Sequence, residues 1–419
     1  MKLRKSGQIL LATVVSLGVG LGLTSCSPSN TIDYVYITNT KANPGQINVY
    51  YADSLSGALT QIPDSPYQSG GRNPVGEVTS PNGKNLYVIN RDDNNIVQFA
   101  IGSDGKLYPL NTYNTPGSEP NAIAINQAGT LLFVADFYQP VSTGAAPYSP
   151  TNPGPGDLVV YTINSDGSLG GPVTQTFTQN GTQVSAPYYP LGVGPSGVSA
   201  LANNGFVYVS DTLAVNGAGC SVGQGGIDGL QVSSAGVLTP APGTPYCAGT
   251  TPSAIASDPT SRFLYVTDSR QNQLIGYTIL STGQLVTFPS GPSNTDVFPD
   301  GIVVDPRGQY IYVSNYTSND VSAYAINQQT GSPSALAGAA TYGTGTGPIC
   351  VIVEPGLARF VYTANFLDNT VTGFQLNPNT GTLILNQNSP YLAAGQPTCA
   401  AAVPHGNHAF EHVQSAPGT

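Results

Sequence analysis

Apolar runs of five or six residues alternate with short polar turns along most of the chain, and residues 299–326 contain a representative example. Their sequence is PDGIVVDPRGQYIYVSNYTSNDVSAYAI. Runs rich in Val, Ile and Tyr that are separated by turns with Pro and Gly, or with Asn and Ser, are typical of antiparallel hairpins. A further turn at residues 330–332 leads to a fourth short run near Leu336. The stretch therefore predicts four antiparallel strands, which we name A to D.

The unit recurs along the chain. The aromatic residue of strand B stands at Tyr36, Tyr87, Phe133, Tyr208, Tyr265, Tyr312 and Tyr362, at intervals of 51, 46, 75, 57, 47 and 50 residues. Repeats of this length with four strands each are typical of propeller blades. Strand A recurs with Pro first and Gly, Ala or Cys third, beginning at Pro74, Pro120, Pro195, Pro252, Pro299, Pro348 and Pro397. A small third residue suits a place where seven inner strands crowd around one axis.

These repeats predict an all-β fold, a seven-bladed β-propeller of four-stranded antiparallel blades that spans residues 34–403. The first strand B, at residues 34–39, has no strand A before it, and the last strand A, at residues 398–403, has no complete blade after it. We therefore expect the C-terminal strand A to join the first blade. Closing the ring in this way removes an exposed sheet edge.

The first 25 residues have the pattern of a secretory signal peptide, with three basic residues followed by an apolar stretch over residues 9–23. The signal ends in LTSC, which resembles a bacterial lipobox, so we expect Cys26 to be lipidated and residues 26–33 to form a tether. Ser27 after the Cys favours the outer membrane, facing the periplasm or the cell surface. An ordinary cleaved signal with an incidental Cys is the alternative. No later apolar run is long enough to cross a bilayer.

Removal of the signal peptide leaves nine basic residues against 22 acidic ones, a formal charge of −13. An acidic chain without basic runs argues against nucleic acid as a partner. The partners we expect are the membrane, through the lipid on Cys26, and an unidentified protein, peptide or glycan, and we expect the protein to be a monomer. The apolar fraction, 40%, is ample for a core.

Two long insertions separate strands B and C, at residues 137–156 in blade three and 212–225 in blade four. Because successive strands reverse direction, the B–C and D–A connections lie on the same face of the ring. Loops on a rigid scaffold commonly carry function, and the alternative is that these two only cover the ring.

Strand B ends in Asn or Asp in all seven repeats, and a ring of such residues could suggest a metal site. Asx side chains commonly cap turns through the backbone, so we interpret the seven as structural, and we expect no metal and no cofactor. The residues are Asn39, Asn90, Asp136, Asp211, Asp268, Asn315 and Asn365. Residues 404–419, which hold His405, His408, Glu411 and His412, are expected to be a solvated tail rather than a metal site.

Four cysteines besides Cys26 allow three disulfide pairings. Cys220 lies in the insertion of blade four and Cys247 in the following D–A connection, on the same face. Cys350 and Cys399 occupy equivalent positions on strands A that ring closure makes neighbours. We therefore expect the disulfides Cys220–Cys247 and Cys350–Cys399, the second only if its Cα atoms come within roughly 7 Å.

The YVYITN, LYVIN and IYVSN repeats, together with Ser-Pro-Tyr before strand A, resemble the YVTN and lactonase-type seven-bladed propellers. That family includes bacterial 6-phosphogluconolactonases and fungal carboxymuconate cyclases, and the resemblance covers residues 34–403. The cyclases imply a His base with acidic and Arg partners at the channel mouth. This chain has no His before His405, so a His base on the blades is excluded.

Two functions follow from these observations. The first, which we favour from the sequence, is a lipid-anchored binding or scaffold module that uses the loop-rich face. The second is a lactone hydrolase that works at the channel mouth, if its candidate residues converge in one cavity. Those candidates are Glu77, Asp300, Arg72, Arg91 and Arg270.

Glu77 is the unusual residue among them, because the other six strands A carry Ile, Val or Ala at its position. A carboxyl group in such packing is costly unless it is paired or protonated. We expect Glu77 to be partly buried beside a cation or an N–H group, with Arg72 or Arg91 as its partner. A purely structural role is the first interpretation, and a general base with a raised pKa is the second.

The anchor can be tested directly. Replacement Cys26→Ser should move the protein from the membrane pellet to the soluble fraction, because the acyl chains would have no attachment site. Fractionation with immunodetection measures this, with Cys350→Ser as the control that should stay in the pellet. A Cys26→Ser protein that still sediments with membranes would show that another feature anchors it.

Overall fold

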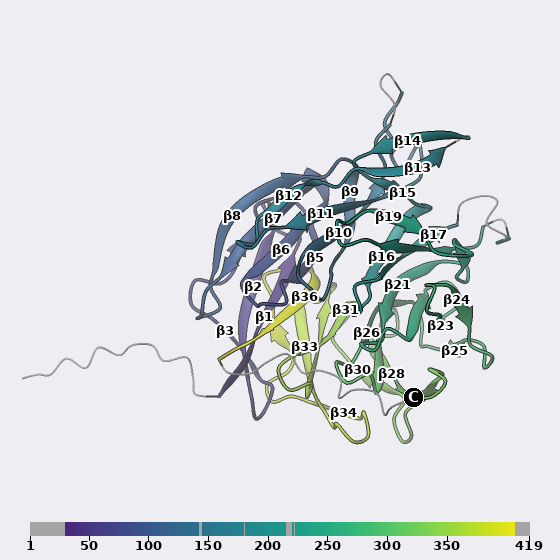
Figure 1. Ribbon diagram of the computed structural model, residues 1–419. Coiled ribbons are helices and arrows are strands. Elements are labelled where there is room, and N and C mark those ends of the chain that lie inside the picture. Colours follow the sequence, from purple (N-terminus) through teal and green to yellow (C-terminus); the bar gives the residue numbers. More distant parts are fainter. Residues whose placement is uncertain (1–29, 142–144, 180, 215–219, 222, 407–419) are drawn as a thin grey trace, which may run out of the picture.

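The computed structural model describes residues 30–141, 145–179, 181–214, 220–221 and 223–406. Seven antiparallel sheets stand around a common axis, so the predicted seven-bladed propeller is confirmed (Figure 1). Neighbouring inner strands contact each other all the way round the axis. In blades one to seven these inner strands are β36 (Pro397–Pro404), β5 (Pro74–Thr79), β9 (Ser118–Ile125), β16 (Val193–Ala200), β21 (Pro252–Ser257), β26 (Pro299–Val304) and β31 (Pro348–Val353).

Three further strands complete each blade outward from the axis. The second strands are β1 (Thr31–Asn39), β6 (Asn85–Asn90), β10 (Leu131–Tyr138), β17 (Phe206–Leu213), β22 (Phe263–Asp268), β27 (Tyr310–Asn315) and β32 (Phe360–Asn365). The third are β2 (Gln46–Asp53), β7 (Asn95–Ile101), β11 (Asp157–Ile163), β18 (Gly226–Val232), β23 (Gln273–Ile279), β28 (Asp320–Ile326) and β33 (Thr370–Leu376). The outer ones are β3 (Leu59–Gln61), β8 (Leu107–Asn114), β12 (Leu169–Pro172), β19 (Leu238–Pro240), β24 (Leu285–Thr287), β29 (Pro333–Ala335) and β34 (Leu383–Leu385).

The ring closes as predicted, through the last strand of the chain. β36 pairs antiparallel with β1 and supplies the inner strand of blade one, with Tyr34 opposite Val403 and Thr38 opposite Cys399. The sheet of blade one therefore runs in the order β3-β2-β1-β36. Segments from both ends of the described chain are thus held in one sheet, as the purple and yellow strands show (Figure 1).

Some elements were not predicted from the repeats. Six blades gain a two- or three-residue strand that pairs with the third strand just before the chain turns inward, namely β4 (Tyr67–Gln68), β15 (Tyr189–Pro190), β20 (Tyr246–Cys247), β25 (Ser293–Asn294), β30 (Thr341–Gly343) and β35 (Tyr391–Leu392). Blade three also carries a separate hairpin at its rim, β13 (Gln175–Gln179) with β14 (Thr182–Ala186), and blade two a 3-10 turn, η1 (Arg91–Asp93).

The hydrophobic core is divided among the spaces between neighbouring blades. Seven clusters of buried side chains fill these spaces, and each draws on the facing surfaces of two blades. Between blades four and five, for example, Tyr208 and Ile227 pack with Leu264 and Val266. Each sheet therefore buries both faces, which explains why the second strand reads as an unbroken apolar run.

A hydrogen bond from the aromatic residue of the second strand links most blades to the next one. In six blades a buried Tyr donates its hydroxyl to the carbonyl of a Gly in the turn between the third and outer strands of the next blade. The pairs are Tyr36 with Gly105 (3.2 Å), Tyr87 with Gly167 (2.7 Å), Tyr208 with Gly283 (2.8 Å), Tyr265 with Gly331 (2.7 Å), Tyr312 with Gly381 (2.8 Å) and Tyr362 with Gly57 (2.8 Å). A bond of this kind contributes about 1 kcal/mol, and its loss leaves a buried carbonyl unpaired.

Blade three, where Phe133 has no hydroxyl, obtains the same bond from its rim hairpin. The Nε2 atom of Gln175 donates to the Gly236 carbonyl at 3.0 Å, and its Oε1 atom accepts from the backbone N–H of Leu238 at 2.8 Å. Gln175 is fully buried. The β13–β14 insertion thus completes the seventh seam between blades.

The glycine turns yield a test that separates backbone strain from crowding. Gly331 has a φ of 77°, and an added Cβ would lie 2.4 Å from Cδ1 of Phe263. Gly291 has a φ of 71° but nothing within 4 Å of an added Cβ. Gly291→Ala should therefore lower the unfolding free energy by about 1 kcal/mol through strain alone. Gly331→Ala should lower it by about 3 kcal/mol, because crowding of a buried ring is added.

Chemical denaturation of both variants beside the parent protein measures the difference. Equal losses for the two would show that the contact between Gly331 and Phe263 contributes nothing to the seam.

Candidate functional site at the entry of the central channel

The inner strands all begin on one face of the ring, which we call the entry face. It carries the connections that lead into the inner strands and those between the second and third strands, which include both long insertions. The predicted positions of these insertions are confirmed, since they lie between β10 and β11 and between β17 and β18. Residues 1–29, with the predicted signal peptide and Cys26, lie outside the described residues, as do His408, Glu411 and His412. Within the described part, no helix has the length and apolar character needed to cross a bilayer.

The turn before each inner strand is tightly folded. In six blades the residue just before the opening Pro has a positive φ, and in four of these it is not Gly. These residues are Asn73 (φ 54°), Glu119 (φ 57°), Phe298 (φ 62°) and Gln396 (φ 51°). Non-glycine residues in this region are strained and are often found at functional sites.

Asparagines of neighbouring blades hold several of these turns. The side-chain oxygen of an Asn in the second-to-third-strand turn accepts the backbone N–H of the residue before Pro in the next blade. The pairs are Asn94 with Glu119, Asn272 with Phe298, Asn319 with Gly347 and Asn369 with Gln396, all at 2.8 Å. Blades three and four have the long insertions in place of this short turn, which makes their part of the entry face different.

The second residue of each inner strand forms the next layer of the channel entry. All seven are half-buried: Val75, Asn121, Ser196, Ser253, Asp300, Ile349 and Thr398. Asn121, Ser253 and Thr398 donate to the carbonyl of the opening Pro in the neighbouring blade, at 2.9, 2.7 and 2.7 Å. Asp300 is the one carboxylic acid among the seven, and burial raises its pKa to about 6. A carboxyl group with this pKa is suited to proton transfer near neutral pH.

The three candidate arginines do not join Asp300 in one cavity. Arg72 is exposed and pairs with Asp93 at 2.7 Å, and Arg270 is exposed in the turn after β22. Arg91 pairs with Glu119 at 3.2 Å, and its guanidinium lies over the ring of Phe137 at 5.5 Å. Among the described residues, no contact joins any two of the five predicted site residues. The expected convergence is therefore not observed.

Glu77 is buried as expected, with 3% of its surface exposed, but the predicted Arg partner is wrong. Both arginines pair elsewhere because β5 directs this side chain toward blade one. There it lies beside Cys399 and Thr38, and neither carboxyl oxygen makes a hydrogen bond of normal geometry. Burial, reinforced by the nearby Cys399 sulfur, raises the pKa of Glu77 well above its ordinary value, which favours the protonated form.

The packing around Glu77 also explains the small third residue of the inner strands. An added Cβ at Gly76 would lie 3.2 Å from Cγ2 of Ile123, and one at Gly197 2.9 Å from Cγ2 of Ile255. The fourth residue of one inner strand thus packs on the third residue of the preceding one. Glu77 holds the fourth position in blade two, so its neighbour is the third residue of β36, Cys399.

The ring of Asn and Asp at the ends of the second strands is structural, as interpreted from the sequence. Asp268 accepts the backbone N–H groups of residues 250, 251, 270 and 271, which caps the turns on both sides. Asn315 donates to Asp320 and Ser322 on the next strand. Within the described residues, no group of three His, Cys, Asp or Glu side chains could hold a metal ion.

Two members of this ring form buried pairs with a second acid. Asp136 faces Asp157 across β10 and β11, and Asp211 lies beside Asp228. Burial raises the pKa of Asp136 to about 7, and burial with the charge of Asp136 raises the pKa of Asp157 further. Burial also raises the pKa of Asp228 to about 6. These pairs are most stable when they share a proton.

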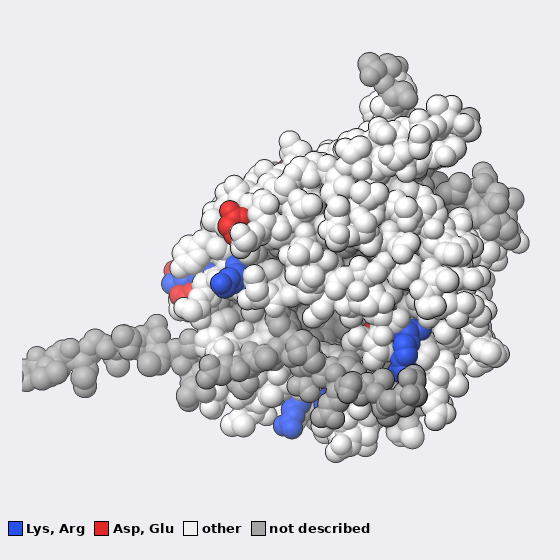
Figure 2. Space-filling model, in the orientation of Figure 1, with Lys and Arg blue, Asp and Glu red and all other residues white. Residues whose placement is uncertain are grey.

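A pocket of about 560 Å³ lies on the opposite face, between blades two and three. Its lining includes Ser80, Asn82, Asn85 and Asn164 but no carboxylate. It therefore offers no acid or base for hydrolysis. In the view of Figure 2, exposed Lys, Arg, Asp and Glu side chains are few among the described residues.

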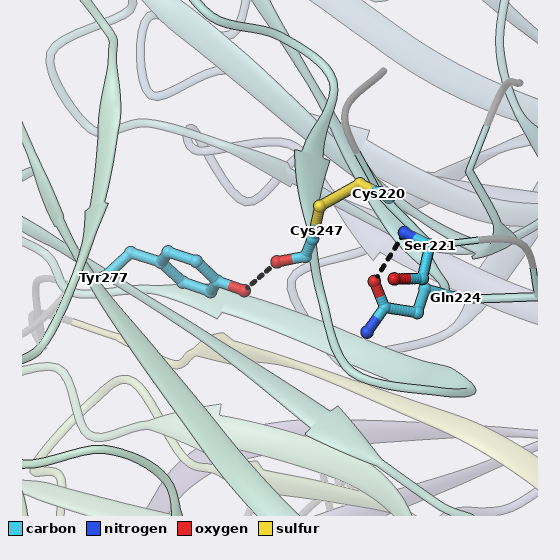
Figure 3. Close-up of a disulfide and its surroundings, with 5 residues drawn as sticks. All are labelled: Cys220, Ser221, Gln224, Cys247 and Tyr277. Atoms are coloured by element: carbon cyan, nitrogen blue, oxygen red, sulfur yellow. Dashed lines mark hydrogen bonds between the residues drawn. A yellow bond between two sulfur atoms is a disulfide. The ribbon is translucent and has the colours of Figure 1, made fainter. Parts of the chain in front are cut away.

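The predicted disulfide Cys220–Cys247 is present, with its Cα atoms 5.4 Å apart (Figure 3). It ties the insertion of blade four to β20, where the carbonyl of Cys247 also accepts the hydroxyl of Tyr277 at 2.8 Å. The second expected disulfide is not formed in the structure. Cys350 and Cys399 are free thiols whose sulfur atoms are 3.7 Å apart, against roughly 2.05 Å in a disulfide.

Comparison with known proteins agrees with this geometry. The family model described as lactonase, 7-bladed beta-propeller matches residues 34–211 and 188–353. The chain therefore belongs to the lactonase family of seven-bladed β-propellers, as its repeats suggested. It is 38% identical over 96 residues to a 6-phosphogluconolactonase of Xenorhabdus nematophila, a match that covers 23% of this chain and only 27% of that protein.

Solved structures share the fold over nearly the whole chain. One is a candidate 6-phosphogluconolactonase of Bacteroides fragilis, with a TM-score of 0.69, 18% identity, and coverage of 90% of this chain and 99% of that one. Another is the periplasmic gluconolactonase PpgL of Pseudomonas aeruginosa, with a TM-score of 0.69, 16% identity, and coverage of 89% and 99%. At these identities the likeness concerns the fold.

The acid pair in blade three gives a pH prediction. The folded-state pKa values of Asp136 and Asp157 lie above the roughly 3.9 of an unfolded Asp, so the folded state binds the extra proton. The stability from this proton is complete below about pH 4 and is lost as the pH rises through 7. The melting temperature should therefore fall between pH 5 and pH 8. Asp136→Asn should make this decrease in melting temperature smaller. Asn is the residue that four other blades carry at this position.

Thermal melts across this range check the slope, with Asp92→Asn at an exposed position as the control of equal charge change. If the melting temperature of Asp136→Asn falls with pH as steeply as that of the parent protein, the pair does not share a proton.

Proposed function

We propose that this protein hydrolyses a lactone at the channel entry, with Asp300 as the general base and without the candidate arginines, which do not converge there. The supporting observation is Asp300 itself, a half-buried carboxyl group with a pKa of about 6 at the mouth of a lactonase-family propeller. Ionised Asp300 would take a proton from water while the water oxygen attacks the lactone carbonyl carbon. The ring C–O bond then breaks, and the proton passes to the departing ring oxygen, which gives a hydroxy acid.

The negative charge that develops on the carbonyl oxygen needs hydrogen-bond donors. β26, which carries Asp300, pairs with β27 on one side and with no described strand on the other. Backbone N–H groups on its second edge would face the channel, apart from that of Gly301, which donates to Oγ of Ser314 at 3.0 Å. Such fixed donors beside the base would stabilise the tetrahedral intermediate without any His or metal ion.

The charges on the entry face favour a lactone without a phosphate group. A phosphate is usually bound by Arg in a bidentate arrangement, or by Lys as a point charge. Arg72 and Arg91 are already paired with Asp93 and Glu119, which leaves Arg270 as the one candidate arginine without an ion pair among the described residues. An uncharged aldonolactone needs no such cation, and the Pseudomonas aeruginosa relative is named as a periplasmic gluconolactonase.

The setting of this activity is also a proposal. We infer that the chain is exported and held at the outer membrane through a lipid on Cys26. The Cys220–Cys247 disulfide is in keeping with an oxidising compartment, where such bonds persist. A monomer without cofactor is sufficient for the proposed reaction, because one ring supplies the base and the donors.

A binding or scaffold role is the second candidate. It is favoured by the long insertions of blades three and four, one of which the disulfide fixes to the entry face. The partner would be a protein, peptide or glycan, and not a nucleic acid, since the chain is strongly acidic.

Activity assays distinguish the two functions. With δ-gluconolactone, the wild-type protein should release acid, and kcat/KM should rise with pH through an inflection near 6, as Asp300 ionises. Asp300→Asn should reduce kcat/KM at least about 100-fold with an unchanged melting temperature. The 6-phospho lactone should be the poorer substrate. Acid release is measured by pH-stat below pH 7.5, where spontaneous opening is slow.

Glu77 supplies the matched control. Glu77→Gln should keep full activity, because this side chain lies between blades and away from the entry. If Glu77→Ile keeps the fold but abolishes turnover while Asp300→Asn does not, Glu77 is the functional carboxyl group. A wild-type protein that hydrolyses neither lactone would leave the binding role as the better explanation.

A further inference from the structure

Two thiols meet where the ring closes. Cys350 is the third residue of β31 in blade seven, and Cys399 is the third residue of β36 in blade one. These inner strands are neighbours, and the two sulfur atoms lie 3.7 Å apart. Both residues are partly exposed. A disulfide would need the two sulfurs to approach from 3.7 Å to roughly 2.05 Å.

The surroundings make the two thiols unequal. Cys350 donates its S–H to the sulfur of Cys399, which favours a thiolate on Cys399. This bond and the backbone N–H groups of Glu77 and Ala400 lower the pKa of Cys399 to about 7. The same bond and burial raise the pKa of Cys350 well above its ordinary value. A thiolate is the reactive form of cysteine, and a thiol with a pKa near ambient pH attacks disulfides fastest.

Glu77 lies next to this pair of thiols, and its protonation state affects the Cys399 thiolate. Its carboxyl group is buried beside Cys399 and Thr38, and neither oxygen makes a hydrogen bond of normal geometry. An ionised carboxylate there would repel the Cys399 thiolate, whereas the protonated acid favoured by burial does not. This accounts for an acid at a position that is apolar in the other six blades.

We propose that Cys399 and Cys350 form a redox-reactive dithiol at the closing seam, which a low-molecular-weight or protein disulfide converts reversibly into an intramolecular disulfide. The Cys399 thiolate attacks one sulfur of the oxidant, R–S–S–R, which forms a mixed disulfide and releases one thiolate. Cys350 gives up its proton to that thiolate and attacks Sγ of Cys399, which releases the second. Two electrons leave the cysteine pair, and the oxidant becomes one thiol and one thiolate.

Oxidation would place a covalent bond between blade seven and blade one. Among the described residues, this seam is held by hydrogen bonds such as that of Tyr362 to Gly57 and by apolar packing, and β36 is the strand that closes the ring. The bond would therefore lock the closing strand in place. This inference concerns the seam and stands independently of the proposed lactone hydrolysis at the entry.

Titration with dithiobisnitrobenzoate, a disulfide whose thiolate product is coloured, tests the proposal. The full chain carries Cys26→Ser in every sample, so that only the seam contributes free thiols. The parent should release two thiolates per chain and retain no adduct by mass spectrometry. Cys350→Ala should release one thiolate and keep the adduct on Cys399, and Cys399→Ala should react at least ~10-fold more slowly. Ala is the residue that blades three and five carry at this position, as Ala122 and Ala254, so both variants should fold.

The oxidised parent should also melt a few degrees higher than the reduced protein, because the bond joins two distant segments. Equal reactivity of the two Ala variants, or a stable mixed adduct on the parent, would overturn the proposal. An intramolecular bond that leaves the melting temperature unchanged would refute the locking role.

Discussion

The hydrogen bond from a buried tyrosine to a glycine carbonyl of the next blade is the constraint on which the ring depends. Apolar packing between two sheets stabilises their association but does not by itself fix their relative position. A directional bond at every seam does, because its donor and acceptor meet in one arrangement only. Six seams use tyrosine, and the seventh uses Gln175 from a hairpin inserted for that blade alone. Blade three therefore has the same hydrogen bond as the other blades, but its donor is a different residue type on a different strand.

The fold could be predicted from the sequence because its pattern is local. Alternating runs and turns define the strands, and Pro and Tyr at fixed places define the blades. The partners of those tyrosines were not visible, since Tyr36 and Gly105 are 69 residues apart and belong to different repeats. The role of Gln175 was hidden for the same reason. What could have pointed to it is the coincidence of a missing hydroxyl at Phe133 with an extra hairpin in the same blade.

The site could be predicted only in part. The position of Asp300 on an inner strand and the entry face followed from the order of the strands, and the Cys220–Cys247 bond from its two loops. The arginines were expected beside Glu77 because they are near it in the chain, but the packing of β5 against β36 decides the direction of that side chain. The pairing of Asp136 with Asp157 was also missed, because the long insertion at residues 137–156 separates the two acids in the sequence.

The pairing of β1 with β36 has a consequence for the order in which the protein can be completed. A chain that emerges from the ribosome with its N-terminus first makes β1 at once, yet the inner neighbour of β1 is the last strand of the ring. Domains that fold during synthesis usually do so from the N-terminus onward. Here the first blade must wait with an open strand edge until the final residues are available. The blade that is synthesised first is thus the last to reach its native structure. Every chain that is truncated before β36 leaves the sheet of blade one without its inner strand.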